Sequence, residues 1–213
     1  TPSMLRHLKQ VLMGKAVKDG DLWCLAICAA CQVGFFFLLR IGEYCAQDAR
    51  SQYKYIIKVK HVTFYKQGVG CQWNEEPDEV SVFIPGSKTD QQMEGAFRSH
   101  YASGKELCPV QALVTWFRFI DGQVGGDEPL FTVPLPEGNV VLTRQAVATA
   151  VKGAAVELGL PASDVATHSL RIGGATALLH AGASADATMI VGRWASDVFR
   201  SYTRYTRHLM EGV

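Results

Sequence analysis

The sequence lacks an excess of charge of either sign. Its 213 residues hold 21 Lys and Arg against 20 Asp and Glu, so the formal net charge is only +1. The net charge therefore excludes attraction of a polyanion by the protein as a whole. A polyanion such as a nucleic acid would have to be bound by a local basic patch. Hydrophobic residues make up 48% of the chain, which excludes a disordered protein and allows one proper core. We expect a single domain over residues 1–213.

Cysteine is also scarce, because six cysteines are too few for a disulfide scaffold. Cys24, Cys28 and Cys31 fall at helical spacing in an apolar run. Zinc sites pair close cysteines with a second pair of Cys or His, and the neighbouring sequence offers no such pair. We therefore predict buried, reduced thiols, no metal, and an intracellular rather than a secreted protein.

Long hydrophobic runs are absent as well. The longest, over 23–39, has 17 residues, includes Gln32 and leads straight into Arg40, whereas a membrane-spanning helix needs about 20 apolar residues. The run indicates no membrane partner. It predicts a buried core helix that continues through Arg40 to about Cys45.

The hydrophobic pattern predicts a mainly α protein with one small antiparallel β-sheet inserted early, an α+β fold. The first helix begins at Thr1, a capping residue followed by proline, and ends at Gly20. Alternating β-branched and aromatic residues predict strands over 55–65, 80–84 and 93–100. A turn-rich linker over 85–90 places Lys88 at the tip of a hairpin. Further helices are expected over 109–120, 143–158, 168–181, 185–191 and 196–208.

Several catalytic signatures are missing too: a Walker phosphate loop, a dinucleotide glycine fingerprint, a zinc-protease histidine pair and a serine elbow. Basic residues in unusual places are present instead. Arg40 follows five apolar residues, and Glu43 lies three residues later, on the same face of a helix, where it can be an ion-pair partner. From this segment alone, a structural ion pair is the simplest interpretation.

A second group of residues begins at His168. Arg171 lies three residues on, so a helix start puts both side chains on one face, and Gly173 and Gly174 allow a neighbouring backbone to approach closely. A guanidinium grips two phosphate oxygens at once, and an imidazole can move a proton. The pair suits a phosphate ligand, although alone it is also typical of a structural contact.

A third group lies near the end of the chain. Trp194 is followed by Tyr202 and Tyr205, each two residues before an arginine. The pattern fits either the end of an amphipathic helix or a segment that carries a nucleophile.

The order of these groups, with Lys88 between the first and the second, resembles the catalytic domain of the tyrosine recombinases, the phage-integrase family. The resemblance covers about residues 1–208. The segment 39–43 looks like the first arginine box of the family and 168–171 like the second. Trp194 stands where Cre-like members carry tryptophan. The run 192–204 looks most like the recombinases of eukaryotic mobile elements of the DIRS and Crypton kind.

The resemblance implies the tyrosine-recombinase catalytic-domain fold and its chemistry. Tyr202 would attack a DNA backbone phosphate, forming a 3′-phosphotyrosyl bond and releasing a 5′-hydroxyl without ATP, metal or cofactor. Arg40 and Arg171 would clamp the non-bridging oxygens and stabilise the charge of the transition state. Trp194 would pack beside the phosphate and donate its indole N–H, and Glu43 would hold the arginine and histidine in place.

Two residues are implied to move protons. Lys88 would give a proton to the leaving 5′-oxygen. His168 would assist proton transfer from the tyrosine, because an ordinary tyrosine pKa of about 10 otherwise keeps that group protonated. Two alternatives stay open: Tyr205, which repeats the pattern of Tyr202, as nucleophile, and Lys66, in an earlier turn, as general acid.

The resemblance also implies double-stranded DNA as the partner, a homo-oligomer, normally a tetramer, on that DNA, and the compartment that holds DNA, which is the nucleus in a eukaryote. Recombination or integration of a mobile element is the expected role. The N-terminal core-binding domain of the family has no counterpart here, so we expect a fragment or a reduced protein. Two other hypotheses are a type IB topoisomerase, disfavoured by the His-x-x-Arg pair, and an inactive DNA-binding domain, disfavoured by the full set of candidate residues.

Overall fold

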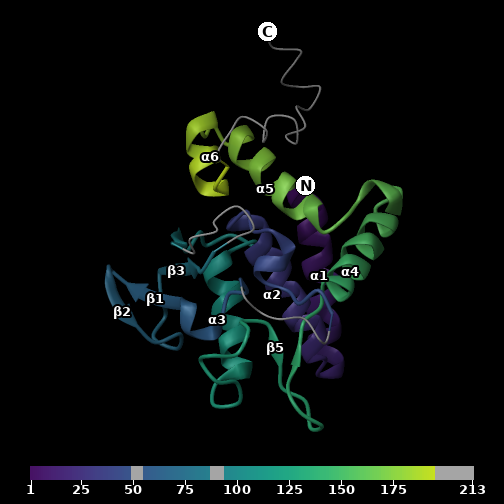
Figure 1. The fold of residues 1–213 in the computed structure, drawn as a ribbon. Helices are drawn as coiled ribbons and strands as arrows, with labels where there is room; N and C mark the ends of the chain where they lie inside the picture. Colours follow the sequence, from purple (N-terminus) through teal and green to yellow (C-terminus); the bar gives the residue numbers. More distant parts are fainter. Residues whose placement is uncertain (49–54, 87–93, 195–213) are drawn as a thin grey trace.

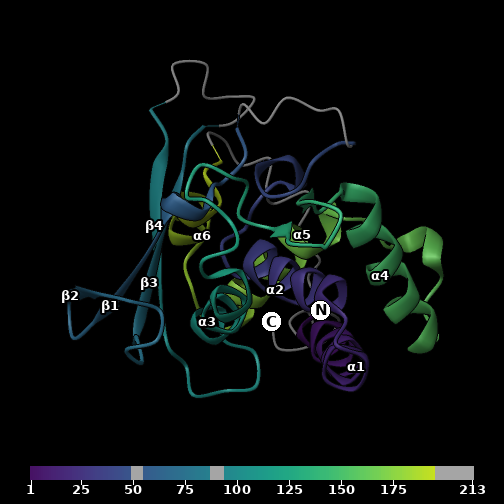
Figure 2. The ribbon, with the colours of Figure 1, turned by 90° about the horizontal axis from the view of Figure 1, so that it is seen from below.

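A computed structural model describes residues 1–48, 55–86 and 94–194 (Figure 1). These residues form a group of helices around one central helix, with a small antiparallel sheet along one side, as the two views in Figure 1 and Figure 2 show. The predicted fold class, mainly α with a small antiparallel sheet, is confirmed. The helix expected over 196–208 lies outside the described residues.

Helix α2 (Leu22–Phe36) is the central helix. The Asp21 side chain caps it by accepting hydrogen bonds from the backbone N–H groups of Trp23 and Cys24, at 2.9 and 3.1 Å. Eleven of its 15 residues are buried, the expected state of a helix that is apolar all round. Within the described ranges, every helix is too short or too polar to cross a lipid bilayer.

The cysteines of α2 are small buried thiols, as predicted. All six cysteines of the chain are free, and Cys24, Cys28 and Cys31 are buried. Burial raises the pKa of the Cys28 thiol to about 11 and raises that of Cys31 as well. These thiols are protonated at neutral pH and are therefore poor nucleophiles.

The predicted continuation of α2 through Arg40 to Cys45 is wrong. Leu38 takes a left-handed φ of 49°, and the Leu39 N–H donates to the Gly34 carbonyl at 3.0 Å. This is the closure of a Schellman motif, in which the left-handed residue is usually glycine. Because leucine stands there instead, the sequence gives no signal that the helix ends at this point.

Helix α1 (Pro2–Asp19) packs beside α2. The Thr1 hydroxyl caps it by accepting from the Met4 N–H at 3.4 Å, and Gly20 ends it with a φ of 66°. The buried residues are Met4, Leu5, Leu8 and Leu12. The predicted opening helix is thus confirmed at both ends.

The four-stranded sheet has the order β2-β1-β3-β4 and is antiparallel throughout. Its strands are β1 (Val62–Lys66), β2 (Val69–Cys71), β3 (Glu79–Ile84) and β4 (Ala96–Tyr101). The predicted hairpin of β3 and β4 is confirmed, with Ile84 opposite Ala96, and Lys88 lies in the connecting segment, outside the described residues. The first strand is shorter than predicted because a 3-10 turn, η2 (Val59–His61), precedes it.

The later helices lie close to their predicted bounds. They are α3 (Pro109–Ile120), α4 (Arg144–Glu157), α5 (His168–His180) and α6 (Ala185–Gly192), with a 3-10 turn η3 (Ala162–Asp164) before α5. The side chain of Thr143 caps α4, as predicted, by accepting from the Ala146 N–H. Leu158, the last residue of the predicted range, follows the end of the helix and is 42% exposed. A two-stranded pair, β5 (Thr132–Val133) and β6 (Val140–Val141), was not predicted.

Candidate active site

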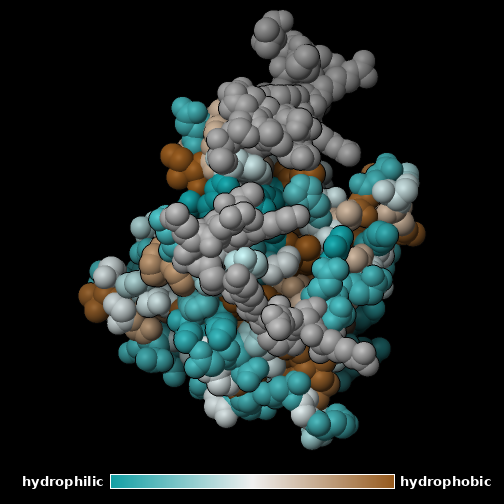
Figure 3. Space-filling model, in the orientation of Figure 1, coloured by the Kyte–Doolittle hydropathy of each residue, from teal (hydrophilic) through white to brown (hydrophobic). Residues whose placement is uncertain are grey.

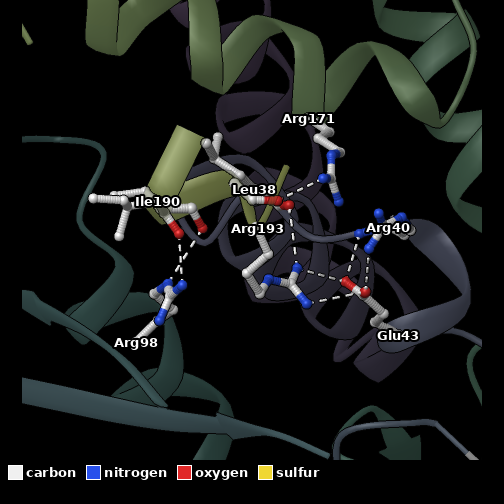
Figure 4. A network of polar contacts seen from close by, with 9 residues as sticks. Leu38, Arg40, Glu43, Arg98, Arg171, Ile190 and Arg193 are labelled. Atoms are coloured by element: carbon white, nitrogen blue, oxygen red, sulfur yellow. Dashed lines mark hydrogen bonds and ion pairs between the residues drawn. The ribbon is translucent and has the colours of Figure 1, made fainter. Parts of the chain in front are cut away.

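Four segments of the chain meet in one place: the turn after α2, the strand β4, the start of α5 and the end of α6 (Figure 4). The turn after α2 begins with Arg40 in an extended conformation and continues as a single 3-10 turn, η1 (Ile41–Glu43). In Figure 3, strongly hydrophilic surface gathers below α6 on the face shown. The side chains that meet here are Arg40, Arg98, Arg171 and Arg193 with the carboxylate of Glu43, and we refer to them as the cluster (Figure 4).

Glu43 is the acidic centre of the cluster. It is 2% exposed, and its carboxylate accepts a hydrogen bond from the Arg40 backbone N–H at 2.8 Å and another from Arg40 Nη1 at 3.2 Å. Arg193 binds the same carboxylate with two nitrogens, Nη1 to Oε1 at 3.0 Å and Nη2 to Oε2 at 2.8 Å. The predicted pair of Arg40 and Glu43 is present, although it is formed across a 3-10 turn rather than along a helix face.

Arg171 is the most deeply buried arginine of the cluster, at 1% exposed. Its Nη2 donates to the Gly192 carbonyl at 2.6 Å, and its guanidinium lies 4.4 Å from the centre of the Trp194 ring. Its Nη1 is buried and has no hydrogen-bond partner among the described residues. Burial, and then the charge of Arg40, lowers the pKa of Arg171 to about 9. An anion beside Nη1 would relieve both the missing bond and the unfavourable charge.

The glycines after Arg171 explain how α5 reaches this position. A Cβ on Gly174 would overlap the Phe35 carbonyl oxygen of α2, and one on Gly173 would lie 3.4 Å from the Phe35 ring. The prediction that these glycines let a neighbouring backbone approach is therefore confirmed at Gly174. The close crossing of α5 and α2 brings Arg171 next to the turn that carries Glu43.

His168 is the first residue of α5 and is exposed beside the cluster. Partial burial, followed by the charges of Arg171 and Arg40, lowers the pKa of His168 below its ordinary value of 6.5. The imidazole is therefore neutral at pH 7 and able to accept a proton.

The cluster has more positive than negative charge. Arg40, Arg171, Arg193 and Arg98 gather around the single carboxylate of Glu43 (Figure 4). In addition to Arg171 Nη1, Arg193 Nε is buried without a partner in the part of the chain that the structure describes. Surplus charge with unpartnered guanidinium N–H groups suits an oxyanion such as a phosphate.

Of the residues predicted from the sequence, Arg40, Glu43, His168, Arg171 and Trp194 are brought together. Lys88, Tyr202 and Tyr205 lie outside the described residues. Lys66, the alternative general acid, ends β1, two strands away from β4, where its ammonium donates to the Glu75 carbonyl at 3.0 Å. In residues 1–48, 55–86 and 94–194, no three His, Cys, Asp or Glu side chains gather in a way that holds a metal ion.

Three solved structures with a similar fold are described as recombinases. A XerA recombinase is similar over 100% of this chain and 60% of its own, with a TM-score of 0.63 and 15% identity. A XerH site-specific recombinase bound to its difH substrate before cleavage is similar over 99% of this chain and 51% of its own, with a TM-score of 0.62 and 16% identity. The XerH complex after cleavage of a palindromic difH substrate is similar over 98% of this chain and 49% of its own, with a TM-score of 0.65 and 16% identity.

The chain has the tyrosine-recombinase catalytic-domain fold. It spans about half to three fifths of the length of these recombinase chains. No family model matches the sequence, and no curated protein sequence matches it.

Two arginines of this recombinase fold were not predicted as site residues. Arg193 directly precedes Trp194, and Arg98 of β4 donates from Nη2 to the Ile190 carbonyl at 2.5 Å and from Nε to the Val191 carbonyl at 3.3 Å. Their partners are backbone carbonyls and a glutamate 150 residues away in sequence, so no local pattern announces them.

Proposed function

We propose that this protein is a tyrosine recombinase, a DNA strand transferase that cuts and rejoins DNA at specific sites through a 3′-phosphotyrosyl intermediate. One observation carries the proposal. In a tyrosine-recombinase fold, Arg40, His168 and Arg171 come from distant parts of the chain to one cluster with surplus positive charge. This arrangement suits a DNA phosphate that is to be attacked.

The arginines are the electrostatic part of the mechanism. Arg171 is held by the Gly192 carbonyl and by the Trp194 ring, and Arg40 is held by Glu43. Guanidinium groups fixed in this way do not have to rearrange when negative charge develops around the pentacoordinate phosphorus. Because this reorganisation cost is avoided, fixed groups stabilise a transition state better than mobile ones. We assign both arginines to the non-bridging oxygens of the scissile phosphate, and the Trp194 indole N–H to the same phosphate.

Two further residues carry the protons of the reaction, one as acceptor and one as donor. The Tyr202 hydroxyl gives its proton to the neutral His168 while its oxygen bonds to phosphorus. The bond from phosphorus to the 5′-oxygen then breaks, and Lys88 donates a proton to that oxygen. The energy of the phosphodiester is kept in the phosphotyrosyl bond, so the reverse sequence rejoins a strand without ATP, metal or cofactor. Tyr205 is the alternative nucleophile.

The biological setting belongs to the same proposal. Two of the structural neighbours are XerH complexes with a DNA substrate, which supports double-stranded DNA as the partner of this chain. We further propose that residues 1–213 form one catalytic domain, that a tetramer acts on paired sites, and that the reaction recombines or integrates a mobile element of the DIRS or Crypton kind, in the nucleus if the host is a eukaryote.

A suicide DNA substrate tests the chemistry directly. The protein is incubated in EDTA with a nicked or half-site duplex whose cleaved fragment diffuses away, and covalent adducts are separated on a denaturing gel. Wild type is expected to form an adduct, Tyr202→Phe to form none, and Tyr205→Phe to behave as wild type. An adduct lost only in Tyr205→Phe would move the nucleophile to that residue.

Other results would point to the alternative functions. Relaxation of supercoiled plasmid, without exchange between paired sites, would identify a type IB topoisomerase. DNA binding without any adduct from wild type would identify a binding domain that has lost strand transfer.

A further inference from the structure

Arg193 has a backbone conformation that arginine rarely adopts. It follows the last residue of α6 with φ 55° and ψ 45°, in the left-handed region. Helices that end in this way usually have glycine at this position, because any Cβ is crowded there. The residue before it, Gly192, shows that glycine is available locally, yet the left-handed position is occupied by an arginine. Contacts of the arginine side chain have to offset the cost of this conformation.

That side chain forms the strongest contact of the cluster. Both terminal nitrogens of Arg193 bind Glu43, one to each oxygen, at 3.0 and 2.8 Å, and Nη2 also lies 3.5 Å from the Leu38 carbonyl. The Arg193 side chain is 13% exposed and that of Glu43 is 3% exposed. A bidentate pair with so little solvent contact is much stronger than a surface ion pair.

Arg40 shares the same carboxylate less closely. Its guanidinium makes one hydrogen bond to Oε1, at 3.2 Å, and its side chain remains 31% exposed. The second oxygen, Oε2, is bound by Arg193 and by the Arg40 backbone N–H. Because Arg193 takes the bidentate position, Glu43 cannot grip both arms of the Arg40 guanidinium.

We propose that Arg193 is a positioning residue that neutralises Glu43 and so keeps the Arg40 guanidinium available for the DNA phosphate. The proposal rests on the proposed function, since it names the ligand that Arg40 receives. Without Arg193, the buried carboxylate has Arg40 as its remaining cationic partner. Glu43 then binds both arms of Arg40 and removes them from the phosphate. Arg193 also joins the end of α6 to the Arg40 turn, so it links the two segments physically.

A double-mutant cycle separates this role from simple structural support. Arg193→Gly removes the side chain and suits the left-handed backbone, and Glu43→Gln removes the competing charge while it keeps the shape. The four proteins are wild type, each single variant and Arg193→Gly/Glu43→Gln. The rate of adduct formation is measured with a suicide substrate in single turnovers at saturating DNA, so that weaker binding does not enter the rate.

We expect Arg193→Gly to slow adduct formation by about tenfold or more, which is less than the roughly 100- to 1000-fold cost of losing a fixed donor outright, because Arg40 is diverted but not removed. Arg193→Gly/Glu43→Gln is expected to recover most of that rate, because the amide has no charge to capture both arms of Arg40, while its oxygen still accepts a hydrogen bond that holds the Arg40 turn. A matched control is Gln67→Gly, which makes the same backbone change at an exposed left-handed residue with φ 54°, in the turn after β1. It should react as wild type does.

Two results would overturn the proposal. One is an Arg193→Gly protein that folds and reacts at the wild-type rate. The other is a double variant that is slower than Arg193→Gly, because a purely structural role predicts accumulated damage rather than recovery.

A measurement without DNA keeps the test independent of the proposed function. Sulfate, which has the shape of phosphate, should raise the melting temperature of wild type at low concentration, where its general salting-out effect is small, by an amount that grows as ln(1 + c/Kd), where c is the sulfate concentration. We expect that rise to shrink in Arg193→Gly and to return in the double variant. This pattern, together with no adduct from wild type, would support the role of Arg193 at an oxyanion site while rejecting strand transfer. An equal rise in wild type and Arg193→Gly would reject the role itself.

Discussion

Gly174 of α5 lies directly against the Phe35 backbone carbonyl of α2, with no space for a side chain between them. A Cβ at Gly174 would also lie 2.5 Å from the Leu38 side chain. This crossing places the segment that carries Arg171 beside the turn that carries Arg40. The geometry of the site thus depends on a hydrogen atom at Gly174 in the position where every other residue carries a Cβ atom.

Substitution of Gly174 by alanine is expected to destabilise the fold by about 1–3 kcal/mol, the usual cost of forcing extra volume into a packed interior. The free energy of unfolding in urea measures it. Gly153→Ala is the matched control, because Gly153 also lies inside a helix but a Cβ there meets nothing within 4 Å. It should stabilise by up to about 1 kcal/mol through helix propensity alone. Equal changes in the two variants would contradict the close crossing.

Arg98 is expected to hold the end of α6 in place. It donates to the carbonyls of Ile190 and Val191 in the last turn of the helix, where carbonyls lack the usual partner four residues on, although the Ile190 carbonyl also accepts from the Arg193 N–H at 3.2 Å. Arg98→Ala should therefore raise the rate of amide hydrogen exchange in α6 and lower the unfolding free energy by about 1–3 kcal/mol. Arg118→Ala, which removes the same charge from an exposed position of α3, should change neither quantity. Unchanged exchange in α6 of Arg98→Ala would show that these bonds do not hold the helix.

The helices and the hairpin could be predicted because their signals are local. Thr1 and Gly20 bound α1, Thr143 caps α4, and the alternation in β3 fixes its buried face. The end of α2 could not be predicted, because Leu38 takes the position that glycine usually fills. Its left-handed conformation depends on a fully buried side chain, which is a tertiary effect.

The candidate site divides in the same way. Arg40 and Arg171 each stand in an apolar or glycine-rich segment where a charged residue needs a partner, and each segment alone also fits a structural contact. They were predicted as site residues from the order of the motifs along the chain, which resembles that of the tyrosine recombinases. Arg193 was not predicted, since its partner Glu43 lies 150 residues away in sequence, and Arg98 binds only backbone carbonyls. Ion pairs between distant segments leave no trace in the local pattern of either segment.

Stability is expected to fall as the pH is lowered from 7 to 5. The pKa values of His61, His100 and His168 are all lowered below 6.5, with burial as the largest cause in each. In that range the unfolded chain binds more protons than the folded chain, so protonation favours unfolding. Carboxylates with lowered pKa values contribute only at more acidic pH, because their ordinary value is already 3.8. Urea unfolding at pH 7, 6 and 5 measures the slope.

His100 offers the specific check of that pH dependence. Its Nε2 lies 2.9 Å from the Phe36 carbonyl, and its ring packs edge-on against Phe36 and Phe37. His100→Gln keeps an N–H donor but cannot be protonated, so the slope between pH 7 and 5 should become smaller. A stability that is flat over this range in wild type would contradict the lowered pKa values.

Trp194 is expected to act in two ways, by supporting Arg171 through its ring and by donating its indole N–H to the phosphate. The guanidinium of Arg171 lies 4.4 Å from the ring centre, and a Cβ on Gly192 would collide with that ring, so the tryptophan is packed closely on both sides. A cation over an aromatic ring away from solvent is stabilised by about 2 kcal/mol. Trp194→Phe keeps the stacking and loses the N–H, whereas Trp194→Ala loses both. We expect adduct formation to slow in both variants, and by at least about tenfold more in Trp194→Ala, because 1.4 kcal/mol corresponds to a factor of ten. Single-turnover rates on the suicide substrate measure the difference, and equal rates for the two variants would mean that only the N–H matters.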